Sequence, residues 1–292
     1  MEHQPVLLAE VLDFLSGLEN GGVFLDATLG LGGHARAVLE TYPKSRVIGV
    51  DRDVEMQAVA RQRLVEFGER IEFHHAPFAE LDRVCETAGV EKVHGVLFDL
   101  GVSSPQLDTA ERGFSFRHDA PLDMRMDRSE GETAADLVNR LPEKELGNLI
   151  YELGEERASR RVARAIVVER RRERIETTGR LAEIVRRVVR GSGRIDAATR
   201  TFQALRMAVN EEREQLAAGL DAAAGRLAPG GRVITISFHS GEDRICKNAL
   251  RADERLTVLT KKIVRPSREE ARGNRRARSA KLRAAERRQD VA

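Results

Sequence analysis

Three aspartates stand at positions where carboxylates could act together. Asp26, Asp51 and Asp99 each follow a short run of β-branched and aromatic residues typical of a buried strand. Because parallel strands end at one edge of a sheet, we expect the three carboxylates at that edge, where folds of this kind bind ligands. A carboxylate there can accept hydrogen bonds from ribose hydroxyls, balance a cation or orient an amine.

A glycine-rich turn follows the first aspartate. Gly30, Gly32 and Ala35 fit the pattern G-x-G-x-x-A, and Asp51 follows Gly30 by about 20 residues, the spacing of an acid that binds ribose. Glycines allow a tight turn and let backbone N–H groups approach a ligand. A nicotinamide dinucleotide and S-adenosylmethionine both use such a turn and acid. Asp26 favours the second, because it lies where the cationic amino acid of this donor would bind.

Other side chains near this edge are further candidates. Gly33 and His34 prolong the turn, and His34 either contacts the ligand or starts a helix. Phe78 follows the third predicted strand, where it either packs on adenine or belongs to the core. Asp99 is the candidate catalytic residue, because a carboxylate that accepts the N–H of an exocyclic amine would orient the amine and favour the charge that develops.

These residues need a sheet to position them. Strands are predicted at 23–26, 46–51, 71–74, 93–100 and 232–238, with a further extended pair near 256–264. Helices are predicted at 5–18, 35–39, 54–67, 78–88 and 211–227. Short connections in the order β-α-β-α-β-α-β indicate a parallel, doubly wound, Rossmann-like α/β sheet.

A long helical stretch interrupts this pattern. Roughly 130 residues separate the fourth and fifth predicted strands, whereas a βαβ unit needs only about 30. The surplus is predicted to form helices at 134–140, 143–153, 157–174, 180–189 and 197–209, with a break at 191–193. We therefore expect a sheet domain made of residues 1–108 and 208–292, and a helical insert domain at 109–207.

The composition excludes several classes of protein. The chain has 292 residues, of which 41% are hydrophobic, enough for a sizeable core. No apolar run approaches the ~20 residues of a membrane span, and the N-terminus has no basic, apolar leader. Cys85 and Cys246 are too few for a disulfide framework or a four-ligand zinc site. We expect a soluble, cytoplasmic protein with no metal site.

Basic residues cluster although the net charge is only +2. In residues 261–292, Lys and Arg outnumber Asp and Glu threefold, which suggests contact with a polyanion. Five cations of this tail have no acid near them in the sequence: Arg275, Arg276, Arg278, Lys281 and Arg283. Four arginines of a second basic stretch share one side of a predicted helix: Arg157, Arg160, Arg161 and Arg164. The alternative for these four is a solvated face with i,i+4 ion pairs.

In combination, these motifs match a known family. The chain closely resembles the bacterial ribosomal RNA small subunit methyltransferase H family, which methylates N4 of a cytosine in 16S rRNA with S-adenosylmethionine. The resemblance covers nearly the whole chain and rests on the segments 3–8, 26–34, 50–53, 98–108, 112–116, 121–127, 154–157, 201–206, 209–211, 237–240, 242–244 and 278–283. Two residues depart from the family pattern, Gly241 in place of Leu and Arg275 in place of Pro, and both concern the substrate side.

The resemblance implies a class I methyltransferase sheet interrupted by a substrate-recognition domain, in agreement with the gap between strands. It implies 16S rRNA, within the small ribosomal subunit, as the partner, and leaves a homodimer open. The implied S-adenosylmethionine contacts are Gly32, Gly33, His34, Asp51, Phe78, Asp99 and Gln106.

A segment after the fifth predicted strand is expected to bind the substrate. Ser237, Phe238, His239 and Ser240 would lie on the same sheet edge as Asp99. Phe238 would stack on a flipped base and His239 would contact it, since a base in structured RNA must be splayed out to be reached. The alternative is a turn with a buried phenylalanine.

Two other functions stay open from the residues alone. A nicotinamide-dependent oxidoreductase would use the same turn, but no Tyr-x-x-x-Lys motif occurs at Tyr42 or Tyr151, the only tyrosines. An inactive RNA-binding assembly factor would keep the fold without turnover. The segment 123–127 is interpreted either as a knot of ion pairs or as a lid over the pocket.

Overall fold

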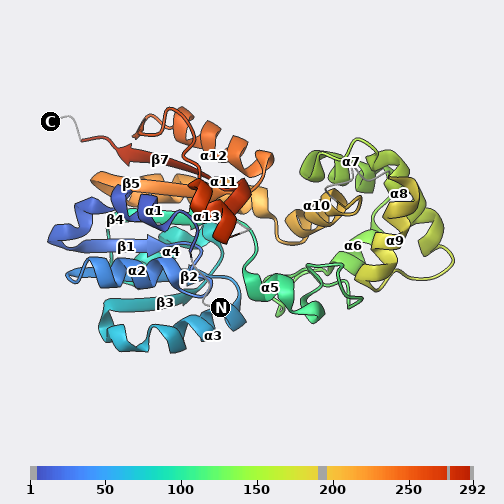
Figure 1. Cartoon of the computed structure of the whole chain (residues 1–292), viewed down its shortest axis with the longest axis horizontal. Helices are drawn as coiled ribbons and strands as arrows, with labels where there is room; N and C mark the ends of the chain where they lie inside the picture. The colour runs from blue at the N-terminus through green and yellow to red at the C-terminus, as the bar shows by residue number, and fades with distance from the viewer. Residues whose placement is uncertain (1–4, 190–195, 275–276, 290–292) are drawn as a thin grey trace. The chain divides into compact units, whose positions relative to one another are not determined.

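The computed structural model describes residues 5–189, 196–274 and 277–289. It divides into two compact units, one formed by Met1–Gly101 with Arg213–Ala292 and the other by Val102–Glu212 (Figure 1). The predicted break at 191–193, the tail cations Arg275 and Arg276, and the resemblance at His3 and Gln4 lie outside the described residues.

The first unit is built on a seven-stranded sheet with the strand order β3-β2-β1-β4-β5-β7-β6. Its strands are β1 (Gly22–Asp26), β2 (Ser45–Asp51), β3 (Ile71–His75), β4 (Val93–Asp99), β5 (Leu227–Ser237), β6 (Leu256–Val258) and β7 (Lys281–Arg287). The first five are parallel to one another, and β7 is antiparallel to both β5 and β6. The chain moves outward from β1 on one side and from β4 on the other, so the switch point lies between these two strands.

Helices cover both faces of the sheet. They are α1 (Leu8–Phe14), α2 (Gly33–Thr41), α3 (Val54–Arg63), α4 (Leu81–Thr87), α11 (Glu212–Arg226), α12 (Ser240–Ala252) and α13 (Arg268–Gly273), with short 3-10 turns such as η3 (Phe78–Glu80). Adjacent strand residues point to opposite faces. Phe24 packs with Val38 of α2 in one core, and Leu25 packs with Leu220 of α11 in the other. The predicted doubly wound, Rossmann-like α/β sheet is therefore confirmed.

The second unit lies in the chain between β4 and β5 and is helical. Its helices are α5 (Ser104–Asp108), α6 (Ala134–Arg140), α7 (Glu143–Gly154), α8 (Ser159–Arg170), α9 (Thr178–Val188) and α10 (Thr199–Val209). They enclose a core of their own, which includes Leu146, Val162 and Leu181. The unit begins at Val102 and ends at Glu212, so several residues that we expected in the sheet domain cluster with the helices instead.

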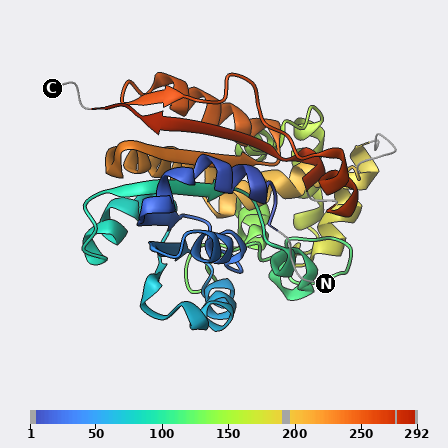
Figure 2. The same cartoon turned by 60° about the vertical axis from the view of Figure 1, so that its left-hand side comes forward.

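Part of the C-terminal tail, Lys281–Arg287, forms strand β7 of the sheet, although the charge of the tail suggested contact with a polyanion. Strand β7 lies between β5 and β6 (Figure 2). Its side chains Leu282, Ala284 and Ala285 are buried. Arg283 is also buried, and its guanidinium donates to Asp243 of α12 at 2.7 Å. The expectation that Arg283 has no acid to pair with was therefore wrong, because the acid comes from a distant helix.

The segment 123–127 forms a knot of polar contacts within the second unit. Arg125 makes two hydrogen bonds to the carboxylate of Asp123, at 2.8 and 3.0 Å. The buried guanidinium of Arg112 donates to the carbonyls of Arg125 and Met126, at 3.1 and 2.9 Å. Asn210 braces the same segment, because its side chain bonds the Met124 carbonyl and the Met126 N–H, each at 2.8 Å. These contacts favour the ion-pair interpretation over a mobile lid.

Candidate active site

The three strand-end aspartates gather at one edge of the sheet, as their positions predicted. Asp26 pairs in register with Gly49 of β2 and Leu97 of β4, so β1 lies between the strands that carry Asp51 and Asp99. Thr28 connects two of them. Its N–H donates to Asp26 Oδ1 at 3.2 Å, and its hydroxyl oxygen accepts the Asp99 N–H at 2.7 Å. The edge thus holds three carboxyl groups within one hydrogen-bonded frame.

The glycine turn between β1 and α2 needs glycine for conformation and for space. Gly30 and Gly32 have φ values of +51° and +78°, in the left-handed region that favours glycine. A Cβ at Gly32 would lie 2.6 Å from the Leu64 side chain, and one at Gly33 would lie 2.7 Å from Pro5. The turn therefore keeps a bare backbone next to the aspartates, with the N-terminus of α2 at its end.

Asp51 is aimed by two backbone donors. Its Oδ2 accepts the Gly30 N–H at 2.7 Å, and its Oδ1 accepts the Asp53 N–H at 2.8 Å. Asp53 in turn caps α3 by accepting from Glu55 and Met56. Each carboxylate oxygen has a second lone pair. The group can thus hold ribose hydroxyls in addition to the backbone.

Burial, and to a smaller extent the charge of neighbouring carboxylates, raises the pKa values of all three acids. Burial raises the pKa of Asp51 to about 6, against the backbone hydrogen bonds that lower it. Burial, with a smaller contribution from Asp51, raises the pKa of Asp26 to about 7. Burial, then the charges of Asp26 and Glu242, raises the pKa of Asp99 to about 8. Neither Asp26 nor Asp99 pairs with Lys or Arg in the described part of the chain, so a bound cation would relieve the repulsion.

His34 lies beside the acid of β4. Its side chain is only 6% exposed, and its Nδ1 lies 3.7 Å from Asp99 Oδ2. Its Nε2 lies 3.1 Å from the carbonyl oxygen of Val6. His34 thus lies at the start of α2, as one of the two interpretations held. Its side chain also lies beside the carboxyl group of Asp99, the candidate catalytic residue. The sequence contained no signal for that pairing.

Phe78 comes directly after β3 and packs against the sheet. Its ring makes an edge-to-face contact with Phe98, with centroids 5.7 Å apart. A Cβ at Gly219 of α11 would lie 2.7 Å from Phe78 Cβ, so the helix packs closely here. The side chain is half-buried, which leaves part of the ring for a ligand.

The four candidate substrate residues at the end of β5 differ in burial and in their contacts. Ser237 is buried, and its hydroxyl faces the Lys281 carbonyl of β7. Phe238 is half-buried, 3.5 Å from where a Cβ would stand at Gly101. His239 caps α12, since its Nδ1 accepts the Glu242 N–H, and Ser240 is the exposed first residue of that helix.

Glu242 is a buried acid that the sequence reasoning missed. Its side chain is 5% exposed, and its Oε1 lies 2.8 Å from His239 Nε2. Its Oε2 accepts the Phe238 N–H at 3.1 Å. An acid three residues after a helix cap is typical of a capping box, which is the signal that could have found it. Glu242 therefore sets the shape of the segment 237–240.

Gln106 belongs to the second unit, which begins at Val102. It is buried, and its Oε1 accepts the Ser103 N–H at 2.8 Å at the start of α5. It is thus not among the residues that the first unit brings together.

The four arginines predicted on one helix side are divided between paired and unpaired side chains, and Arg157 lies in the turn before α8, which begins at Ser159 and not at residue 157. Arg160 bonds the Lys144 carbonyl and Asn148, and Arg164 pairs with Glu143 at 3.4 Å. Arg157 and Arg161 are exposed and have no acidic partner among the described residues. Arg160 and Arg164 thus follow the alternative of a bonded, solvated face, whereas Arg157 and Arg161 stay available for a polyanion.

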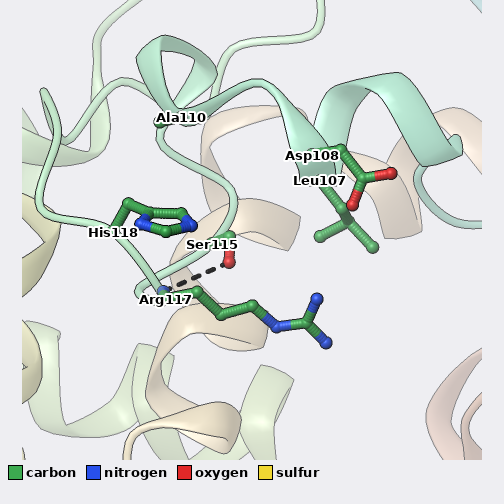
Figure 3. A pocket seen from close by; sticks show the side chains of 6 residues that line it. All are labelled: Leu107, Asp108, Ala110, Ser115, Arg117 and His118. Atoms are coloured by element: carbon green, nitrogen blue, oxygen red, sulfur yellow. Dashed lines mark hydrogen bonds between the residues drawn. The ribbon is translucent and has the colours of Figure 1, made fainter.

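The second unit also holds a small cavity of about 60 Å³ (Figure 3). Six residues line it: Leu107, Asp108, Ala110, Ser115, Arg117 and His118. The Arg117 N–H donates to the Ser115 hydroxyl at 3.3 Å, as the dashed line marks. The cavity has room for a few water molecules and not for a nucleoside.

The described residues contain neither a membrane-spanning helix nor a cluster of metal-binding side chains. No helix in this part of the chain is long and apolar enough to cross a membrane. No group of three His, Cys, Asp or Glu side chains in the same residues has a geometry that could hold a metal ion.

Comparisons with known proteins point to a methylase. The chain is 53% identical over 286 residues to the ribosomal RNA small subunit methyltransferase H of Synechococcus elongatus, covering 98% of this chain and 94% of that protein. It is 53% identical over 288 residues to the protein of the same name from Sorangium cellulosum, covering 98% and 91%. The solved structure of an rRNA methylase from Streptococcus thermophilus aligns with a TM-score of 0.45 at 14% identity, over 99% of each chain. The family model described as the MraW methylase family matches residues 1–288. The chain therefore belongs to the MraW methylase family.

Proposed function

We propose that this protein transfers the methyl group of S-adenosylmethionine to the exocyclic N4 amine of a cytosine in the decoding region of 16S rRNA. The observation that carries the proposal is the set of three carboxyl groups, Asp26, Asp51 and Asp99, around one glycine turn at the sheet edge. Membership of a methylase family favours this donor over a nicotinamide dinucleotide. The names of the relatives support rRNA of the small subunit as the substrate.

The residues at the sheet edge fit the donor. Asp51 has lone pairs free for ribose hydroxyls, and the turn leaves backbone at Gly32 and Gly33 where a Cβ would clash. Phe78 offers a partly exposed ring for adenine. Asp26 is a buried carboxyl group that a cation would stabilise. In this proposal His34 and Asp99 complete the donor contacts of the first unit.

Asp99 orients the acceptor and takes its proton. When bound, S-adenosylmethionine supplies an electrophilic methyl group on a sulfonium. Asp99 Oδ1 is buried and has no hydrogen-bond partner among the described residues, so it can accept the N–H of the cytosine amine. Methyl transfer needs an in-line approach more than covalent help, and a fixed carboxylate supplies that orientation. A pKa of about 8 suits a base that works near neutral pH.

The substrate side is assigned to the segment 237–240. Phe238 stacks on the target base, while Glu242 holds His239 and the Phe238 N–H in one arrangement. The helical unit binds rRNA phosphates through its free arginines, Arg157 and Arg161. The protein acts on the small ribosomal subunit in the cytoplasm.

Mass spectrometry of rRNA nucleosides tests this function directly. Cells that lack the gene are expected to lose N4-methylated cytidine from 16S rRNA, and the wild-type gene is expected to restore it. The Asp99→Asn variant, which cannot take the proton, is not expected to restore it. Unchanged nucleosides in the deletion strain would reject the function. Purified wild-type protein that moves no labelled methyl group to small subunits would instead favour an inactive assembly factor.

A further inference from the structure

The two nitrogens of His34 face different partners. Nε2 lies 3.1 Å from the Val6 carbonyl oxygen, and Nδ1 lies 3.7 Å from Asp99 Oδ2. A carbonyl oxygen only accepts hydrogen bonds, so Nε2 carries a hydrogen. Nδ1 therefore presents either a lone pair or a second N–H to the carboxyl group of Asp99.

The approach of these two groups favours one proton on the pair. An ionised carboxylate and the lone pair of a neutral imidazole are both acceptors and repel each other. His34 is only 6% exposed, so water screens this repulsion poorly. A proton on Nδ1, or on Oδ2, turns the repulsion into an attraction.

The other oxygen of Asp99 stays available. Oδ1 is buried without a hydrogen-bond partner in the described residues. The main chain of Asp99 cannot shift freely, because its N–H donates to Thr28 Oγ1 at 2.7 Å. Leaving a buried acceptor without a donor costs about 1–3 kcal/mol, which a donor from a ligand would recover. Oδ2 of Asp99 thus faces His34, and Oδ1 is left for the acceptor amine.

We propose that His34 is the positioning residue that orients Asp99 and shares one proton with it, so that Asp99 Oδ1 is free to take the proton of the acceptor amine. This inference rests on the proposed function. As the amine nitrogen bonds the methyl carbon, the electrons of the carbon–sulfur bond return to sulfur, and Asp99 Oδ1 receives the amine proton. His34 keeps its own proton on Nδ1. One positive charge thus passes from sulfur to the His34–Asp99 pair, and the net charge of the site is unchanged.

Four groups face Asp99 from the elements packed against it. Asp26 of β1 and Glu242 of α12 oppose its ionisation, Thr28 fixes its backbone, and His34 of α2 can supply a cation. If a substitution at His34 removes the cation, the pKa of Asp99 rises further, because the negative charges of Asp26 and Glu242 are then no longer offset. The acid limb of the pH–rate profile then moves to higher pH.

Two substitutions separate the contact with Asp99 from the contact with Val6. The amide of His34→Asn stands where Nδ1 stands and can donate to Asp99. The amide of His34→Gln stands where Nε2 stands and keeps only the bond to the Val6 carbonyl. Single-turnover methyl transfer to unmodified small ribosomal subunits, with saturating donor, is measured across pH for both variants.

We expect His34→Gln to lower the rate constant about 10- to 100-fold and to move the acid limb upward. His34→Asn is expected to stay within about fivefold of the wild type, with a smaller shift. A native rate and profile for His34→Gln would overturn the inference. So would an Asn variant that falls as far as the Gln variant, because the Val6 contact alone would then explain the loss.

A second measurement needs neither donor nor RNA. Nitrogen NMR of the free protein follows the protonation of His34 Nδ1 as pH changes. Asp99→Asn is expected to make Nδ1 lose its proton at lower pH, since the anionic partner is gone. An unchanged titration would show that no proton is shared.

The two proposals fail in different ways. A wild-type protein that shows the coupled titration but methylates no subunits contradicts the proposed function and not the proton pair. An active wild type with a native His34→Gln profile contradicts only the pair. In the Asp99→Asn background, adding His34→Gln is expected to cause no further loss, because both act through one group. Calorimetry with S-adenosylmethionine and the Tm of each variant measure changes in donor affinity and folding separately, and the rate constants are compared at a donor concentration that saturates each variant.

Discussion

The Gly30 N–H donates to Asp51 Oδ2 at 2.7 Å, so the turn after β1 and the acid at the end of β2 form one hydrogen-bonded unit. A second backbone donor, from Asp53, holds the other oxygen at 2.8 Å. The acid is thus fixed before any ligand arrives. Preorganisation of this kind lowers the entropy lost on binding.

Asp51→Ala is expected to weaken binding of S-adenosylmethionine by about 2–3 kcal/mol, because a charged acceptor of hydrogen bonds is lost. Isothermal calorimetry measures the change. Glu91→Gln is a matched control, since Glu91 is exposed and precedes β4, at the opposite end of the strand from Asp99. Equal affinities for the Asp51 variant and the wild type would remove Asp51 from the donor site.

Donor affinity is expected to fall with falling pH. The pKa values of Asp26 and Asp99 are raised to about 7 and about 8, and a cation binds their ionised forms. Protons therefore compete with the cation as the pH drops through this range, and a loss of at least about tenfold is expected between about pH 8.5 and pH 6. Calorimetry in buffers of different ionisation enthalpy also measures the protons released on binding.

The demethylated product provides the control for this pH dependence. It lacks the sulfonium charge, so its affinity is expected to change much less over the same range. Asp26→Asn is expected to flatten the dependence for the donor as well. A donor affinity that is constant with pH would mean that the carboxyl cluster does not sense the cation.

Arg283→Ala is expected to reduce the free energy of unfolding by about 3 kcal/mol, because Asp243 loses its partner in a partly buried site. Urea denaturation measures the difference. Arg278→Ala is the control, since Arg278 is exposed and donates only to the Ala271 carbonyl. The double variant Arg283→Ala/Asp243→Ala should recover part of the loss. If the two single arginine variants are equally stable, the ion pair contributes nothing.

Arg157→Gln combined with Arg161→Gln is expected to raise the KM for small subunits and to reduce the salt slope of binding by about 1–2. Both side chains are exposed and free of acidic partners among the described residues. Arg140→Gln is the matched control, because Arg140 already makes two hydrogen bonds to Glu132. A salt slope that stays the same in the double variant would mean that this face does not contact RNA.

Removal of the tail is not a clean test of RNA binding. Truncation after Val264 would delete β7, which supplies Leu282 and Ala284 to one core and Ala285 to the other. Loss of these side chains is expected to unfold the first unit. A truncated chain that keeps a cooperative thermal transition would contradict this expectation.

Local patterns in the sequence were sufficient to predict the frame of the site. Apolar runs that end in aspartate predicted three strand ends, and the glycines predicted the turn. The long gap before β5 predicted a helical region. Each of these signals lies within a few residues of the element it describes, because strand burial and turn conformation depend on local side chains.

The sequence by itself therefore determined the parallel sheet, its glycine turn and the acids at its edge. Only the tertiary structure decided that the charged segment Lys281–Arg287 is a strand. No periodic pattern marks this segment in the sequence, and it forms a strand because it is buried between β5 and β6. It also decided that His34 faces Asp99 and that Glu242 holds the Phe238 N–H. Such contacts join residues from different elements, and the packing of the whole sheet, not local propensity, brings them within reach.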